Sequence, residues 1–189
     1  MTPNASILAL RKRFARFAAD QDGVSAVEFA MLLPLMITLY LGGVEVSQAV
    51  SADRKTMLVA HSVGDLISQT SSVATADMSN IYNAANEVAY PFPSANLKVT
   101  ATQVKVDANG NATVDWSCAY NGATARSGNL TSLIPAALLT ANSYLIWSEA
   151  SYNYTPAIGY VITGTLTLRE QIYLRPRQSS SVALTGGCP

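Results

Sequence analysis

The sequence predicts an α+β protein in which a long N-terminal membrane-spanning helix continues into a head with a small antiparallel β-sheet. Three observations predict this fold class. Residues 24–44 form an apolar run, charged only at Glu28, of about the 20 residues that a helix needs to cross a bilayer. No proline interrupts residues 44–69, so the helix is expected to continue past the membrane. Beyond residue 96, apolar and polar residues alternate, as in half-buried strands.

Charge restricts the function and predicts the orientation of the chain. Charged residues make up 13% of the sequence and the formal net charge is zero, which does not favour nucleic acid as a partner. Residues 1–23 carry four basic and two acidic side chains, a net charge of +2, so the remainder is −2. Positive charge stays on the cytoplasmic side, so everything after about residue 46 is expected outside.

Four segments are expected on this basis. Residues 1–23 form a basic leader, 24–46 the transmembrane helix, 47–70 an extension of that helix outside the membrane, and 71–189 the exported head. An ordinary secretory signal would have a shorter apolar region, about 7–15 residues, and a small-residue cleavage site close behind it. An anchor that is never cut stays open as an alternative, because hydropathy does not separate it from a processed helix.

One carboxylate and one proline interrupt the apolar run. Glu28 lies one turn inside it, where an ionised carboxylate costs about 2.5–3.5 kcal/mol unless it is paired or protonated. Cleavage after Gly23 would supply a partner, the new amine on Val24, because Glu28 would then be the fifth residue of the chain. Pro34 removes a backbone donor and is expected to kink the helix.

The order of a basic leader, Gly23, four residues, Glu28, Phe29 and an apolar helix resembles the type IV prepilin processing site. More narrowly, Gly-x-x-x-x-Glu-Phe-Ala-x-x-x-Pro resembles the TadE/TadG-like minor pilins, or pseudopilins, of the Tad (Flp) pilus system. Residues 164–168 and 174–177 resemble closing strands of the same family. The resemblance implies cleavage between Gly23 and Val24 by a prepilin peptidase, a role for Glu28 and Phe29 in assembly and amine pairing, and a pilin-like head.

The same resemblance implies partners and a location. The expected partners are the membrane, the prepilin peptidase, other pilins or pseudopilins and the Tad assembly platform. The expected location is the bacterial inner membrane, with a cytoplasmic N-terminus, a periplasmic head and incorporation into a pilus as a further option. Because Flp-type major pilins are much shorter than this chain, a priming, tip or assembly role is favoured over that of the main shaft subunit.

Within the head, a short helix is expected first. Thr75 or Asp77 can cap it, it runs to about Val88, and Pro91 and Pro93 end it. The long helix before it is expected to bury an apolar stripe, made of Val46, Val50, Met57, Ala60, Gly64 and Ile67.

About four antiparallel strands are expected to follow. The first spans residues 97–106, with a bulge or a change of face near Gln103, and Asn109-Gly110 predicts a tight hairpin after it. The return strand is expected to carry Val114, Trp116, Cys118 and Tyr120 on one face. Residues 143–154 form a central strand covered on both faces, and residues 160–168 a half-buried one that residues 172–174 extend or follow. Residues 134–139 form a short helical turn.

Cysteine count and motif content complete the sequence-based expectations. Cys118 and Cys188 are expected to form one disulfide in an oxidising compartment, with two unpaired thiols as the alternative. No sequence motif for a nucleophile elbow, a zinc protease or a phosphate loop is present, so no catalytic residue and no cofactor is expected. His61, the only histidine, has Asp65 four residues on, a surface pair rather than a metal site. The alternative function is an uncleaved, signal-anchored periplasmic binding module.

Overall fold

The computed structural model describes Arg13, Arg16, residues 22–159 and residues 161–189. Most of the expected leader, and Tyr160, therefore lie outside the described residues. The chain divides into two compact units, Met1–Val44 and Glu45–Pro189.

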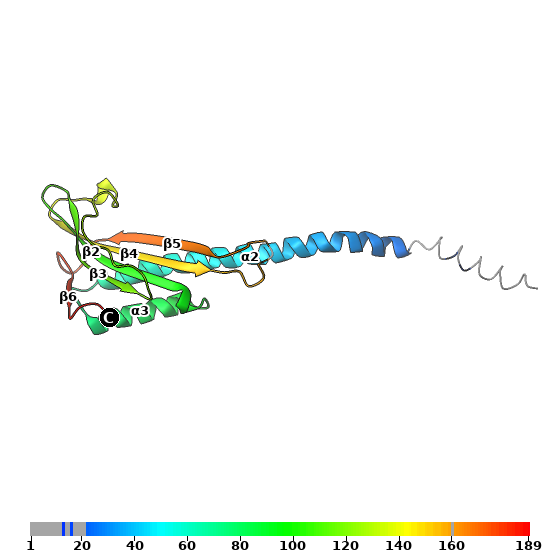
Figure 1. Cartoon of the computed structure of the whole chain (residues 1–189), viewed down its shortest axis with the longest axis horizontal. Helices are drawn as coiled ribbons and strands as arrows, with labels where there is room; N and C mark the ends of the chain where they lie inside the picture. The colour runs from blue at the N-terminus through cyan, green and yellow to red at the C-terminus, as the bar shows by residue number, and fades with distance from the viewer. Residues whose placement is uncertain (1–12, 14–15, 17–21, 160) are drawn as a thin grey trace, which may run out of the picture. The chain divides into compact units, whose positions relative to one another are not determined.

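The long helix α2 runs from Asp22 to Ser68 (Figure 1). It is long and apolar enough to cross a membrane, and its most apolar stretch is not buried within the described chain. Met31, for example, is 77% exposed. The expected long helix is thus confirmed. Pro34 lies inside α2, where its carbonyl accepts a 2.8 Å hydrogen bond from the Thr38 hydroxyl, and the kink stays a prediction.

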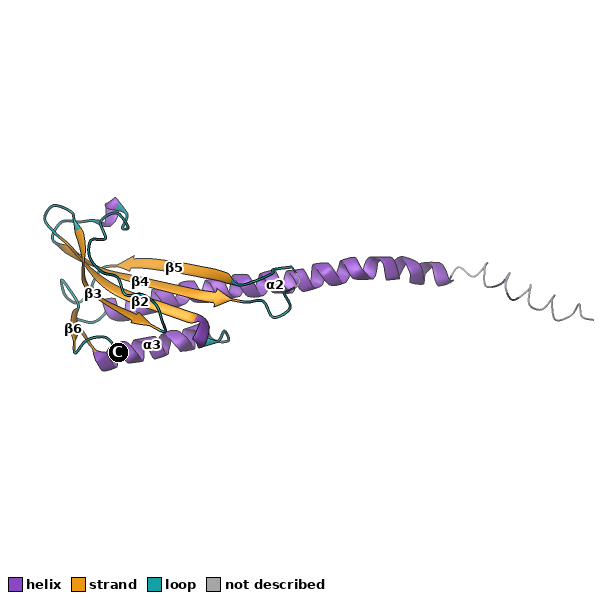
Figure 2. Ribbon diagram, viewed as in Figure 1, coloured by secondary structure: helices purple, strands orange, loops and turns teal. Residues whose placement is uncertain are grey.

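Four strands form the antiparallel sheet of the head, in the order β3-β2-β4-β5 (Figure 2). They are β2 (Leu97–Val106), β3 (Ala112–Tyr120), β4 (Ser143–Tyr154) and β5 (Leu166–Leu174). The hairpin between β2 and β3 contains Gly110 at φ +83°, as the Asn-Gly signal predicts. Short 3-10 turns lie at Ser94–Asn96 and Ala136–Leu138, the second within the predicted segment.

A second, parallel pair of strands was not expected from the sequence. β1 (Ser72–Ala74) follows directly after α2 and pairs with β6 (Ala183–Thr185). The short helix α3 (Thr75–Ala89) begins immediately after β1, close to its predicted bounds. Asp77 accepts a hydrogen bond from the Ala74 amide at 3.0 Å and so stabilises the first turn of α3.

The main core lies between one face of the sheet and two helices, α3 and the part of α2 after Glu45. Its members from the helices are Ala52, Val59, Ala60, Val63, Ile67, Met78, Ile81, Tyr82, Ala85 and Ala89. Its members from the sheet are Leu97, Val99, Ala101, Trp116, Cys118, Ile146, Ala150, Tyr152 and Tyr154. Gly64 lets α2 approach the sheet closely, because a Cβ there would lie 3.2 Å from Ser148 Cβ.

Half of the predicted apolar stripe of α2 is wrong. Ala60, Gly64 and Ile67 are buried, but Val46, Val50 and Met57 are exposed. Buried positions are taken instead by Ala52, Val59, Val63 and Thr56, whose hydroxyl donates to the Ala52 carbonyl at 2.9 Å. The sheet that packs against the helix decides which face is buried, and the apolar periodicity of the helix alone does not reveal that face.

The predicted single face of β3 is also wrong at Val114. The register shifts between Gln103 and Val104, which pair with Trp116 and Val114, so Asp115 is an extra residue in β3. Val114 therefore packs with a second core on the opposite face of the sheet. The buried members of this second core are Val104, Val106, Ala112, Leu130, Ile134, Leu145 and Trp147.

The last predicted strand begins later than expected. β5 starts at Leu166 rather than at residue 160, and residues 172–174 extend it. Gly159 and Gly164 have φ values of +66° and +89°, a conformation that extended strands do not contain. Residues 155–165 therefore form a loop between β4 and β5, apart from Tyr160, which lies outside the described residues.

Candidate functional site

The processing motif lies at the start of α2. Gly23 has no atom within 4 Å of the position that a Cβ would take, and Val24 and Phe29 are more than half exposed. Val24 and Glu28 are four residues apart in one helix, so their side chains share a face. The helix thus brings the predicted amine and carboxylate one turn apart.

Large apolar side chains cover the first unit of α2 and remain exposed in the described chain. They are Val24, Val27, Phe29, Met31, Leu32, Leu33, Leu35, Met36, Ile37, Leu39 and Tyr40. A continuous apolar surface of this kind is stable only when lipid or other apolar helices cover it.

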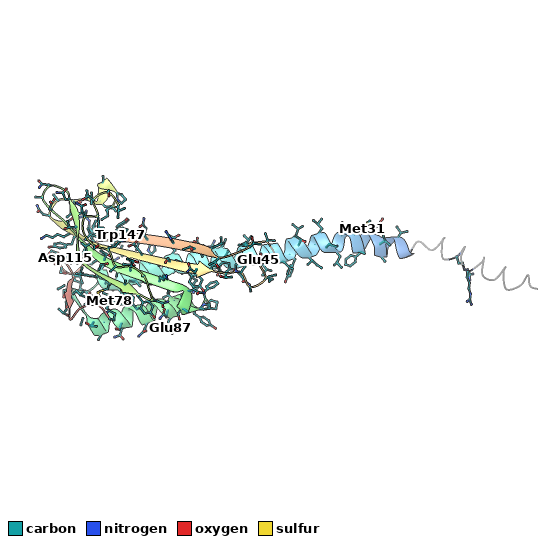
Figure 3. All side chains as sticks on the ribbon, in the orientation of Figure 1. Met31, Glu45, Met78, Glu87, Asp115 and Trp147 are labelled. Atoms are coloured by element: carbon teal, nitrogen blue, oxygen red, sulfur yellow. A yellow bond between two sulfur atoms is a disulfide. The ribbon has the colours of Figure 1, made fainter. Side chains whose placement is uncertain are left out.

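Glu45 is a functional candidate that sequence reasoning missed. It is only 2% exposed, and its Oε2 accepts hydrogen bonds from the Val161 and Ile162 amides, both at 2.9 Å. Figure 3 labels Glu45 on α2, beside the chain that joins β4 to β5. The carboxylate therefore holds the β4–β5 loop against the helix. The sequence does mark Glu45, because it is the first charged residue after the uncharged run. Charged residues are common at the ends of membrane helices, however, so its position alone did not indicate a specific role.

The predicted disulfide between Cys118 and Cys188 is confirmed, with the two Cα atoms 5.3 Å apart. Two further contacts fix the same C-terminal segment. Trp116 Nε1 donates to the Val182 carbonyl at 2.8 Å, and the Val182 amide donates to Gln103 Oε1 at 2.6 Å. Gln103, at the register shift, is 1% exposed. The segment after residue 181 is thus an integral part of the head.

The outer face of the sheet carries an open polar groove. Across it, Arg126 makes two hydrogen bonds to Glu149, at 2.9 and 2.6 Å, and its guanidinium lies 4.7 Å from the Trp147 ring centroid. The hydrogen bonds to Glu149 raise the pKa of Arg126. Lys98, Arg169 and Glu170 also line the groove, so it offers both signs of charge to a polar ligand.

The remaining candidates are structural in character. Within the described ranges, no cluster of three or more metal-ligating side chains occurs. Asp65, four residues after His61, forms an ion pair with Arg177 at 2.8 Å. Arg175 donates to Thr140 Oγ1 at 2.6 Å, so both arginines of the closing segment contact their own chain.

The class that the described residues define is a protein with one candidate membrane-spanning helix and a disulfide-bonded α+β head. Residues 23–63 match the model of a family described as TadE-like protein. The resemblance is therefore confirmed over this segment: residues 23–63, which lie within α2, are TadE-like, and the family suggests involvement in the Tad pilus system. The head beyond residue 63 lies outside the matched segment. Comparison with curated proteins and with solved structures found no match for the chain.

Proposed function

We propose that this chain is a minor pilin or pseudopilin that a prepilin peptidase cleaves after Gly23 and that takes part in assembly of a Tad (Flp) pilus. The observation that carries the proposal is the TadE-like match, which begins at Gly23 and covers the apolar helix containing Glu28. The proposed topology has the N-terminus in the cytoplasm and the head in the periplasm of the bacterial inner membrane, because the basic residues precede the helix.

Assembly would use the exposed apolar surface of α2. Cleavage creates an amine on Val24 that shares a helix face with Glu28. Among lipid tails or packed helices, an unpaired charge of either kind costs several kcal/mol. Glu28 of one subunit would therefore pair with the Val24 amine of a neighbour, or with its own, while Phe29 contacts the neighbouring helix. Partners in this proposal are other pilins or pseudopilins and the Tad assembly platform.

The first test is the mass of the N-terminal peptide, for protein purified from membranes that contain the native peptidase. Wild type is expected to begin at Val24 and the Gly23→Arg variant to keep its leader. Gly43→Ala is the matched control, since Gly43 also lies in α2 with no atom within 4 Å of an added Cβ. An intact leader in wild type would refute the proposal.

A second test separates cleavage from assembly. Glu28→Ala is expected to leave cleavage intact and to reduce the number of pili, because the amine loses its partner. Glu87→Ala removes an exposed carboxylate from α3 and serves as the control. Normal pilus numbers in Glu28→Ala would contradict the pairing role of Glu28.

The alternative function is an uncleaved, signal-anchored periplasmic binding module. The polar groove with the Arg126–Glu149 pair is the observation that favours it. An intact leader in both wild type and Gly23→Arg would select this alternative, and binding studies with polar ligands and an Arg126→Ala variant would follow.

A further inference from the structure

We propose that one end of the head, formed by the β4–β5 loop and the α3–β2 turn, is an interfacial surface that inserts its apolar side chains into the lipid bilayer crossed by α2. This inference rests on the membrane insertion of the proposed function. It adds a lipid-binding site in the head, outside the segment that resembles TadE-like proteins.

The first argument is the position of the β4–β5 loop along the chain. Glu45 directly follows Val44, the last residue of the uncharged run, so the boundary of the bilayer falls close to Glu45. The carboxylate of Glu45 accepts the amides of Val161 and Ile162. These bonds hold the loop against Glu45, the residue next to which the membrane surface is expected. They also satisfy two amides that would lack partners in a water-poor interface.

The second argument is composition. Residues 155–165 contain no charged residue, and Ile158 and Val161 in this loop are each 50% exposed. Exposed aliphatic side chains on an uncharged loop fit the boundary between headgroups and acyl chains.

The third argument is a second uncharged segment at the same end of the sheet. Residues 90–96 join α3 to β2 and contain no charged residue, and Tyr90 within them is 73% exposed. The ring of Phe92 lies 5.9 Å from that of Tyr152 in β4, which ties this turn to the end of the strand that enters the β4–β5 loop. Tyrosine is enriched at membrane interfaces because its ring is apolar and its hydroxyl polar.

The opposite end of the sheet differs in charge. There, Val106 pairs with Ser143 and the β2–β3 hairpin carries Lys105 and Asp107. Charged groups are disfavoured in the acyl region and remain in water. The connecting segments at the two ends of the sheet therefore differ in charge, as membrane-facing and water-facing loops should, with the exposed Glu87 and Lys98 in the helix and strand that flank the uncharged turn.

The test places a tryptophan at the proposed surface. The full chain carrying Ile158→Trp is reconstituted into phosphatidylcholine–phosphatidylglycerol vesicles with or without brominated acyl chains, and tryptophan emission is recorded after subtraction of wild type. Leu133→Trp is the matched control, because Leu133 is 52% exposed and lies near Leu130, which bonds to Ala112 at the hairpin end. Val161→Trp provides a second position in case Ile158→Trp fails to fold.

Brominated lipid is expected to lower the added emission of Ile158→Trp at least about two-fold, since interfacial side chains sit about 5–10 Å deep, and to leave Leu133→Trp unchanged. Equal quenching at both positions, or none at residues 158 and 161, overturns the proposal. If the emission of the added tryptophan depended on protein concentration rather than on bromination of the lipid, a second copy of the chain would be what covers this surface. That result would also overturn the proposal.

The proposed function is judged separately, by flotation and by the mass of the N-terminal peptide. A chain that floats with vesicles and is cleaved at Gly23 but shows no quenching refutes only the lipid surface. A chain that stays in the aqueous phase refutes both.

Discussion

Replacing Glu45 by alanine removes the acceptor of two backbone amides, and the cost follows from the geometry. Both amides lie 2.9 Å from Oε2 of a carboxylate that is 2% exposed. A hydrogen bond to a charged group contributes about 1.5–3 kcal/mol, so the two bonds together hold the loop by about 3–6 kcal/mol. Opening of the loop should therefore become at least about 100-fold more frequent in Glu45→Ala.

Glu45→Gln is the matched variant, because it keeps an acceptor oxygen and removes only the charge. Neutral hydrogen bonds are about half as strong, so a loss of about 1.5–3 kcal/mol is expected. The assay is amide hydrogen exchange, followed by mass spectrometry, of a peptide covering residues 156–165 of the full chain in detergent micelles. Exchange should rise in the order wild type, Glu45→Gln, Glu45→Ala, while a hairpin peptide covering residues 107–113 stays constant. Unchanged exchange in Glu45→Ala would refute this reasoning.

Three further predictions concern the stability of the head. Reducing the Cys118–Cys188 bond, which spans 70 positions, should lower the free energy of unfolding by about 4 kcal/mol in urea titrations; a midpoint that reductant leaves unchanged would contradict this, and the double alanine variant should not respond to reductant. Gly64→Val should destabilise by about 1–3 kcal/mol because its methyl groups meet Ser148, and a loss below about 0.5 kcal/mol would show that the sheet yields. Hydrogen bonds from Asn111 lower the pKa of the Asp107 carboxyl below its ordinary value of 3.8. The stabilisation that these bonds give the hairpin is therefore fully present above pH 3.8 and is lost as the pH falls through the lowered pKa of Asp107. An NMR titration giving 3.8 or more for Asp107 would disprove the last prediction.

Local signals predicted much of the fold. Asn109-Gly110 predicted the β2–β3 hairpin because tight turns require positive φ, and the proline pair after Val88 marked the end of α3. The cysteine pair was predicted from an even count in an oxidising compartment. The motif from Gly23 to Pro34 predicted the TadE-like family, because its residue types occur at fixed spacing within one helix.

The features that sequence reasoning missed depend on contacts between distant segments. Val114 changes face because one extra residue, Asp115, enters β3, and nothing in the local pattern marks that position. The exposure of Val46 could not be foreseen, since the buried face of α2 is chosen by the sheet that packs against it. Glu45 acquires its role from amides more than 100 positions away in the sequence. Hydrophobic periodicity describes one element at a time and contains no information on its partners.

The pairing of β1 with β6 has a consequence for the biogenesis of this protein. The Thr185 hydroxyl donates a hydrogen bond to the Val73 carbonyl, 112 positions earlier in the chain. The first strand after α2 can therefore complete its pairing only when the C-terminal segment is present. Until residues 183–185 are in place, Ser72–Ala74 remains an unpaired strand edge. The strand between α2 and α3 therefore becomes fully paired only after the C-terminal segment of the head has folded against it.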